Sequence, residues 1–278
     1  MITFKKFAFG RSGFGNQLFQ YVGAKLYAEL NNFGYRFPEW IGNKVFSGIK
    51  LNNNLKRLDS LRYYFLTTRQ LSDLGSYSRW QSIKWFLSPN YFRLPPTVSL
   101  ESLYKNPEDH IDLYGYFQDE LSFSLLKKHK HIVLDWFSFK KEIDEPLYKL
   151  TEKFRPWIGV HIRRGDFVKL KLALPIEQYK KTLEQIYNNQ NVFIASNDES
   201  VKKDFSKFNL INISNPLKDI PDYIFDFWML KNAETIIGGG STFSWWAAYL
   251  SNNDSYYSSP LVHLWKQYKK IEITKQKI

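Results

Sequence analysis

The sequence predicts an α/β protein built on parallel β-sheets, and three observations predict it. Strand-like and helix-like segments alternate through the second half of the chain, a pattern typical of parallel sheets covered by helices. Polar clusters follow the predicted strands directly, which is where ligands bind in such folds. The length of 278 residues suits one large domain or two ordinary ones, at roughly 100–200 residues per domain.

The second half of the chain has the clearer pattern. Proline stands at the start of two of its helices, where the missing amide proton costs no hydrogen bond. The expected elements are strands at 157–162, 192–195 and 235–237 and helices at 175–188, 221–233 and 241–250.

The first half is harder to interpret, because residues 35–100 are aromatic and interrupted by Gly, Asn and Pro. We place the domain boundary between residues 150 and 151, giving domains 1–150 and 151–278. The expected elements are a strand at 2–9, a Gly-rich turn at 10–15, a helix at 16–30, a strand at 111–117 and helices at 121–131 and 140–154.

Composition excludes several classes of protein. An apolar fraction of 44% with 18% aromatic residues provides a packed core and argues against disorder. The absence of cysteine excludes disulfides and thiolate chemistry. No apolar run approaches the roughly 18 residues of a membrane span, and no signal peptide is evident, so we expect a cytoplasmic protein. The net charge of +12 favours polyanions, anionic small molecules or an anionic membrane face.

The first polar cluster is Gly13-Phe14-Gly15-Asn16-Gln17. Its glycines, Gly15 among them, allow a tight turn and let the backbone approach a ligand. It lacks the third glycine of a dinucleotide fingerprint and the Gly-Lys-Ser/Thr of a P-loop. The alternative is an ordinary strand–helix turn with Asn16 as the helix cap.

The second cluster is His161-Ile162-Arg163-Arg164-Gly165-Asp166. A strand projects His161 and Arg163 to one face and Arg164 to the other. Arginine at the end of a strand can bind phosphate through two parallel hydrogen bonds, and Asp166 can orient it. The alternative is a buried Arg–Asp pair that ties the strand end to its loop.

The third cluster runs from Gly238 through Ser241, Thr242, Phe243 and Ser244 to Trp246. Free amide groups, hydroxyls and a helix dipole make the start of such a helix a good anion site. The alternative is a Ser/Thr helix cap after a flexible loop. The two tryptophans, Trp245 and Trp246, fit core packing better than ligand stacking.

Weaker signals come from acids. Asp198 follows a predicted strand and can accept hydrogen bonds from a purine edge or cap the next helix. Asp119 and Glu120 offer two carboxylates, or mark a helix start. No spacing of His, Asp and Glu matches a known metal motif, so we expect no metal and no cofactor.

The clusters together resemble the inverting α-1,2-fucosyltransferases of glycosyltransferase family 11. Five segments carry this resemblance, in order along the chain. They are Gly13–Tyr21, Gly115–Gln118, Val160–Asp166, Phe193–Asp198 and Ser241–Ala247.

The resemblance implies a GT-B fold, in which two Rossmann-like domains face each other across a cleft. It implies an acceptor-side first domain and a second domain that binds GDP-fucose without a metal. Arg163 matches the arginine that binds the donor β-phosphate, His161 a histidine of the nucleotide site, and Asp166 a supporting acid. The implied donor contacts are Gly15, Arg163, Arg164, Asp198, Ser241, Thr242, Phe243 and Ser244, with Asn16 in the loop at the reacting centre.

The implied reaction transfers L-fucose from GDP-β-L-fucose to a sugar hydroxyl, O-2 of a galactoside, with inversion. Alternatives are another GDP-sugar, another fucosyl linkage, or a non-catalytic module that binds glycan or nucleic acid. The diffuse basic residues and missing nucleic-acid motifs disfavour nucleic acid as a partner. The expected partners are a GDP-sugar and a glycan acceptor, and the charge is compatible with peripheral contact with the inner face of an anionic membrane. The candidates for positioning the acceptor hydroxyl and acting as its base are Asp119, Glu120 and the loop at Asn16.

Overall fold

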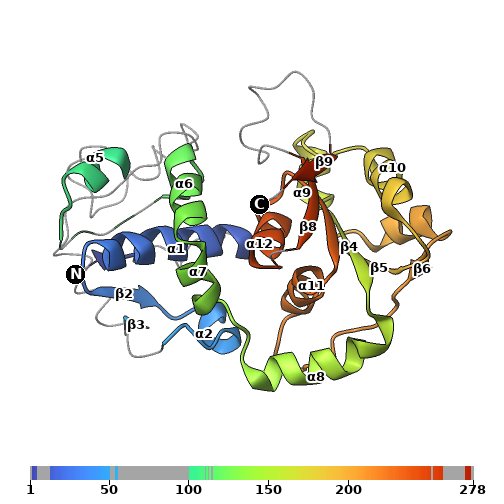
Figure 1. Ribbon diagram of the computed structural model, residues 1–278, viewed down its shortest axis with the longest axis horizontal. Helices are drawn as coiled ribbons and strands as arrows, with labels where there is room; N and C mark the ends of the chain where they lie inside the picture. The colour runs from blue at the N-terminus through green and yellow to red at the C-terminus, as the bar shows by residue number, and fades with distance from the viewer. Residues whose placement is uncertain are drawn as a thin grey trace. The chain divides into compact units, whose positions relative to one another are not determined.

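The chain divides into two compact units, Met1–Lys140 and Lys141–Ile278, in a computed structural model (Figure 1). The expected boundary after residue 150 lies ten residues further along. The helix at 141–151 therefore belongs to the second unit. The structure describes residues 2–4, 13–50, 54–55, 100–109, 111, 113, 115–251, 253–258 and 273–276.

The first unit contains a small parallel sheet in the order β1-β2-β3. Helix α1 (Phe14–Leu30) is buried along most of its circumference. Aromatic and aliphatic residues recur along it at helical spacing and pack into the core of the unit. The chain leaves α1 through Asn32, whose left-handed φ of 55° ends the helix. The remaining described elements are β1 (Ile2–Thr3), β2 (Tyr35–Pro38), β3 (Asn54–Leu55), α2 (Ile41–Val45), α5 (Leu100–Lys105), α6 (Glu120–Lys128) and α7 (Lys130–Trp136).

Several predictions for the first unit are corrected. Helix α1 begins at Phe14, so Gly15 lies inside the helix rather than in a turn. No described residue of the predicted strand at 111–117 is in a strand. Phe117 has a left-handed φ of 53°, which a strand cannot contain. The predicted helix at 121–131 is two helices that meet at His129. Of the predicted strand at 2–9, only Ile2–Thr3 is observed, and residues 5–12 lie outside the described residues.

The second unit is built on a six-stranded sheet in the order β6-β5-β4-β7-β8-β9. Neighbouring strands are parallel except for β8 and β9. All six residues of the central strand are buried, which fits its continuous apolar run. The strands are β4 (Trp157–Ile162), β5 (Asn191–Ser196), β6 (Asn209–Leu210), β7 (Thr235–Gly239), β8 (Asp254–Ser258) and β9 (Ile273–Gln276).

The order of these strands creates a switch point at β4. The chain runs outward from β4 to β5 and β6 on one side, then returns to place β7 and β8 on the other side. Ligands of open parallel sheets bind at the carboxyl ends of the strands where the order reverses. The topology therefore directs attention to the loops that follow β4, β5 and β7.

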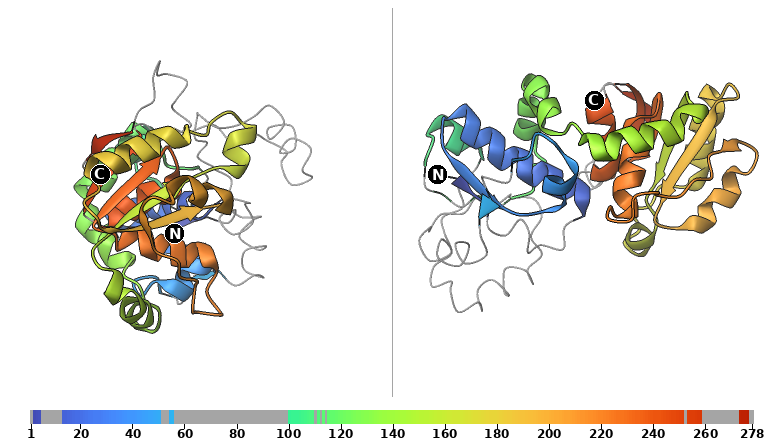
Figure 2. Two further views of the ribbon diagram at one scale, coloured as in Figure 1. Left: turned by 90° about the vertical axis from the view of Figure 1, so that its right-hand side faces the viewer. Right: turned by 90° about the horizontal axis from the view of Figure 1, so that it is seen from below.

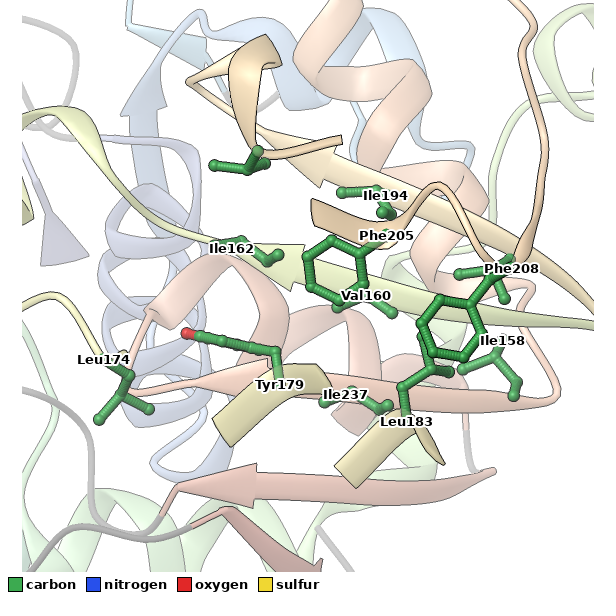
Figure 3. Close-up of a cluster of buried hydrophobic side chains, with 12 residues drawn as sticks. Ile158, Val160, Ile162, Leu174, Tyr179, Leu183, Ile194, Phe205, Phe208 and Ile237 are labelled. Atoms are coloured by element: carbon green, nitrogen blue, oxygen red, sulfur yellow. The ribbon is translucent and has the colours of Figure 1, made fainter. Parts of the chain in front are cut away.

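Alternate residues of β4 face different helices. Ile158, Val160 and Ile162 join a buried cluster with Tyr179 and Leu183 of α10 on one face (Figure 3). On the other face, the Trp157 Nε1–H donates to the carbonyl of Met229 on α11 at 3.1 Å. The helices of this unit are α8 (Lys141–Thr151), α9 (Gly165–Lys169), α10 (Ile176–Ile186), α11 (Asp222–Lys231) and α12 (Thr242–Ser251), with 3₁₀ turns η2 (Glu152–Phe154) and η3 (Glu199–Phe205). Among the described residues, none of the helices has the length and apolar character needed to span a bilayer.

Candidate functional site

His161 lies at the carboxyl end of β4, paired with Ala195 on β5 and Gly238 on β7. Its ring packs against Phe243 of α12 at a centroid distance of 5.1 Å. Burial, reinforced by the nearby Arg163 charge, lowers the pKa of His161 to about 3, so the imidazole is neutral at physiological pH. Its buried Nδ1 has no hydrogen-bond partner among the described residues. A neutral ring with an unmatched polar atom is suited to a hydrogen bond with a ligand or a water.

Arg163 follows β4 and is held by its own loop. One guanidinium nitrogen lies 3.0 Å from the Asp166 carboxylate, and the guanidinium stacks 5.7 Å from the centre of the Phe167 ring. The alternative predicted a buried Arg–Asp pair. The pair forms, but it is not buried, because the two side chains are 38% and 52% exposed. Since a guanidinium has five N–H donors, Arg163 can keep this ion pair and still bind an anion.

Two hydrogen bonds join β4 and β5 at their carboxyl ends, one between the last residues of the strands and one between the loops that follow. The Ser196 hydroxyl donates to the carbonyl of Ile162 at 2.8 Å, and the Arg164 amide donates to the Asn197 side chain at 2.8 Å. Gly165 turns the chain here with a φ of +38°, and a Cβ on it would lie 2.3 Å from the Asn197 amide nitrogen. The glycine is therefore required by both its conformation and the closeness of the second loop.

Asp198 caps the 3₁₀ turn η3 rather than standing free. Its carboxylate accepts from the amide of Ser200 at 3.1 Å and from the Ser200 hydroxyl at 2.6 Å. These two bonds lower its pKa, with a smaller contribution from the Arg164 charge. The helix-cap alternative is thus realised in this structure, and the role of Asp198 in base recognition stays a prediction.

Arg164 lies on the side of β4 opposite to His161. Its charge acts on Tyr179 of α10, partly offsetting the rise that burial causes in the pKa of that phenol, and α10 covers the face of the sheet opposite to α12. The Arg164 Nε is buried without a hydrogen-bond partner among the described residues. The predicted division of the two arginines between faces agrees with these contacts.

The glycines that precede α12 are mainly packing residues. Gly238 and Gly239 belong to β7, not to a flexible loop. A Cβ on Gly238 would lie 2.8 Å from both the Ser244 hydroxyl and the Tyr257 ring. A Cβ on Gly239 would lie 2.3 Å from the Tyr179 hydroxyl. Only Gly240, with a φ of +38°, makes the turn that starts the helix.

The start of α12 is capped by the hydroxyl of Ser241 and is partly buried. The Ser241 hydroxyl accepts from the amide of Phe243 at 3.3 Å, as a cap residue does. Thr242 and Phe243 are half-buried. Ser244 is fully buried, with its hydroxyl 3.4 Å from both the Ser241 carbonyl and the Tyr257 hydroxyl. Its burial favours a supporting role for Ser244 rather than direct contact with a ligand.

The predicted residues of the first unit surround the start of α1. Gly13 precedes the helix in an extended conformation, so the helix cap is Gly13 and not Asn16. The Gln118 side-chain amide donates to the Asn16 side-chain oxygen at 3.0 Å. Asp119 caps α6 by accepting from the amide of Ser122 at 2.7 Å. This bond agrees with the alternative interpretation of Asp119, in which it marks the start of a helix.

Sequence reasoning missed three residues of the second unit. Tyr257 donates its hydroxyl to the carbonyl of Ser241 from β8. The Asn197 side chain accepts from the Arg164 amide and so joins the loops that follow β4 and β5. Burial raises the pKa of Asp226 on α11 to about 7, which marks it as a functional-site candidate. The available signal for Asp226 was its position as a single acid within the apolar run Ile224–Leu230.

The second unit therefore brings most of the predicted residues to one edge of its sheet. His161, Arg163, Arg164, Asp166, Asp198 and Ser241–Ser244 follow three adjacent parallel strands. Gly15 and Asn16 belong to the first unit. Among the described residues, no group of three or more His, Asp or Glu side chains is arranged as a metal site.

The fold and this polar strand edge define a protein of the glycosyltransferase GT-B type. The structure is similar to crystal structures of the fucosyltransferase NodZ from Bradyrhizobium, with a TM-score of 0.58 and 15% identity over 99% of this chain and 98% of that chain. A NodZ α-1,6-fucosyltransferase crystal soaked with GDP-fucose gives a TM-score of 0.58 at 14% identity, covering 99% of both chains. These likenesses confirm the α/β class and GT-B type.

The chain belongs to glycosyltransferase family 11, whose family model matches residues 72–276. An α-1,2-colitosyltransferase from Escherichia coli is 27% identical over 266 residues, covering 87% of this chain and 86% of that protein. The family assignment drawn from the five sequence segments is thus confirmed.

Proposed function

We propose that this protein transfers L-fucose from GDP-β-L-fucose to O-2 of a galactoside, with inversion at the anomeric carbon. The observation that carries the proposal is that Arg163 and the start of α12 lie at the same edge of the second sheet, at its switch point. These two groups follow the neighbouring strands β4 and β7, which are in register at His161 and Gly238. A diphosphate is the ligand that an arginine and a helix N-terminus together suit.

Charge on the leaving diphosphate is the main chemical problem of this reaction. As the bond from fucose to phosphate breaks, negative charge grows on the phosphate oxygens and the sugar resembles an oxocarbenium ion. Arg163 is positioned in advance by Asp166 at 3.0 Å, so it stabilises that charge with little rearrangement. The α12 amides provide further donors, and we propose that no metal is required.

His161 contributes through hydrogen bonding and not through charge. Its pKa of about 3 keeps the ring neutral over the pH range in which most enzymes work. A neutral imidazole donates from one nitrogen and accepts at the other. We therefore assign it to orienting the nucleotide, next to Arg163 on the same face of β4.

The acceptor hydroxyl needs positioning and a base. Asn16 is a candidate for positioning, because it lies in the first turn of α1 and the Gln118 amide holds its side-chain oxygen at 3.0 Å. Asp119 is committed to capping α6. Of the acids named from the sequence for this role, Glu120 remains.

The first test is thermal stability with GDP, ADP and UDP, each with and without EDTA. A ligand that binds only the native state raises Tm by mass action. We expect a rise with GDP alone that EDTA does not remove. Turnover of GDP-fucose with β-galactosides, followed by linkage analysis of the product, then tests the reaction. A rise with UDP alone, or a GDP effect that EDTA abolishes, would contradict the donor assignment or the metal-free assignment respectively.

A second candidate is transfer of a colitosyl group, favoured by the 27% identical relative named α-1,2-colitosyltransferase. The fold and the diphosphate site would serve either sugar, since neither Arg163 nor the start of α12 distinguishes the sugars carried by a diphosphate. Direct competition between GDP-fucose and GDP-colitose at one fixed acceptor separates the two. A higher kcat/KM for GDP-colitose than for GDP-fucose would identify colitose as the transferred sugar.

A further inference from the structure

The segment that follows Arg164 forms a compact projection, the apolar hook, made of residues 165–172. It contains the short helix α9 and a chain reversal at Lys171, whose φ is +57°. Backbone hydrogen bonds close it internally, from Leu170 to Asp166 at 3.0 Å and from Leu172 to Phe167 at 2.8 Å. In the left view of Figure 2 this yellow-green segment stands away from the sheet of its unit.

The hook directs apolar side chains into solvent. Leu170 is 63% exposed and Val168 is 46% exposed, and Leu170 is the most exposed large hydrophobic residue in the described part of the chain. Phe167 points elsewhere, since its ring lies under the Arg163 guanidinium. Because the hook's own hydrogen bonds fix its shape, the two aliphatic side chains are presented by a defined structure and not by an open loop.

The apolar side chains alternate with exposed positive charge. Lys169 and Lys171 flank Leu170 and are both exposed. Residues 163–174 contain four basic side chains and one acidic side chain, and that acid, Asp166, is paired with Arg163. The outer surface of the hook is thus both aliphatic and positively charged.

We infer that the apolar hook docks on the surface of an anionic lipid bilayer. Aliphatic side chains that enter the acyl boundary, next to lysines that meet anionic headgroups, are the features of interfacial binding. A second copy of the chain fits less well, because a stable dimer needs about 800 Å² from each partner, far more than two side chains supply. This inference does not rest on the proposed reaction.

The test is co-sedimentation of the full-length protein with phosphatidylcholine vesicles, with and without phosphatidylglycerol, at low salt. We expect binding only when phosphatidylglycerol is present. Val168→Ser with Leu170→Ser should lower the partition coefficient about tenfold, from the apolar surface removed. Lys169→Gln with Lys171→Gln should lower it by about fivefold for each lysine.

Two matched variants serve as controls. Tyr148→Ser with Tyr223→Ser removes two exposed hydrophobic residues elsewhere in the same unit, and Lys149→Gln with Lys153→Gln removes two exposed lysines. Both should bind as the unmodified protein does, with circular dichroism confirming that all variants are folded. Equal losses in the hook and control variants would overturn the inference, as would no binding to either vesicle. A dimer that only the hook variants dissociate would assign the surface to a second copy instead.

Discussion

Gln118 holds Asn16 across 102 residues of sequence, with its side-chain amide 3.0 Å from the Asn16 side-chain oxygen. Phe117, immediately before it, has a left-handed φ of 53°, and its ring occupies the space that a side chain at position 23 would need. The backbone turn at Phe117 thus places Gln118 at the start of α1. Gln118 thereby restricts the orientation of the Asn16 side chain.

Removing Gln118 should therefore matter only while Asn16 is present. We expect Gln118→Ala to reduce kcat/KM for transfer, because a free Asn16 amide loses its fixed orientation. In a double-mutant cycle, Gln118→Ala should have little further effect in an Asn16→Ala background. Independent, additive effects on kcat/KM would show that Gln118 acts in some other way, and Gln17→Ala provides a neighbouring control.

Arg163 should be required for its shape as well as its charge. We expect Arg163→Ala to lower kcat about 10²- to 10³-fold, as loss of one donor to a developing anion does. Arg163→Lys should restore little, because an ammonium cannot make the two parallel hydrogen bonds of a guanidinium. Steady-state kinetics with GDP-fucose measure both, and more than about a tenth of the unmodified activity in Arg163→Ala would refute the assignment.

Gly239 should not tolerate a methyl group. A Cβ at this position would lie 2.3 Å from the Tyr179 hydroxyl and 2.7 Å from Leu174, so Gly239→Ala should lower stability by about 1–3 kcal/mol through overpacking. Chemical denaturation measures the loss. Tyr179→Phe should recover part of it by removing the hydroxyl. Gly34→Ala is the control, since nothing lies within 4 Å of a Cβ there, and equal losses at both glycines would disprove the packing argument.

Asp226 should make stability fall as pH rises through neutrality. Burial raises its pKa from 3.8 to about 7, so between these values the native state holds a proton that the unfolded state has released. The stability this provides is complete below pH 3.8 and is lost as pH rises through about 7. Asp226→Asn stays neutral throughout. Its Tm relative to the unmodified protein should therefore rise from pH 5 to pH 8 by a few degrees, on the order of 2 kcal/mol.

The control for this effect is Asp204→Asn, which changes an exposed aspartate on η3. Its Tm difference should stay nearly constant over the same pH range. A flat difference for Asp226→Asn would show that its carboxyl titrates normally. Nearby Lys202, Asp222 and Glu199 also influence this pKa, so the measurement should be made at one ionic strength.

The second unit could be predicted well because its strands are buried on both faces. The continuous apolar run at 157–162 gave β4 with its observed bounds, and proline marked the starts of α10 and α11. The strand predicted at 111–117 is not observed among the described residues, and Phe117 there has a left-handed φ of 53°. Side-chain character alone does not determine backbone conformation, which explains why the strand predicted at 111–117 was wrong.

The sequence predicts which residues stand at the strand ends of the second unit, but not the contacts that they make. Strand-end placement identified His161, Arg163 and Ser241 without a structure. No local pattern reveals that Gln118 reaches Asn16, or that Tyr257 supports Ser241 from a later strand. Such contacts depend on how distant segments pack. The glycines before α12 also look alike in sequence, although two are strand residues packed against tyrosines and one makes a turn.

The two hydrogen bonds that join the ends of β4 and β5 have a consequence for engineering. Ser196 ends β5 and Asn197 follows it, whereas Ile162 ends β4 and Arg164 lies two residues beyond. A chimera whose exchanged 196–198 segment carries other residues at positions 196 and 197 would lose both bonds, and Gly165 would lose the Asn197 side chain that lies against it. An exchange of residues with a relative at this edge of the sheet should therefore move residues 161–166 and 196–198 together.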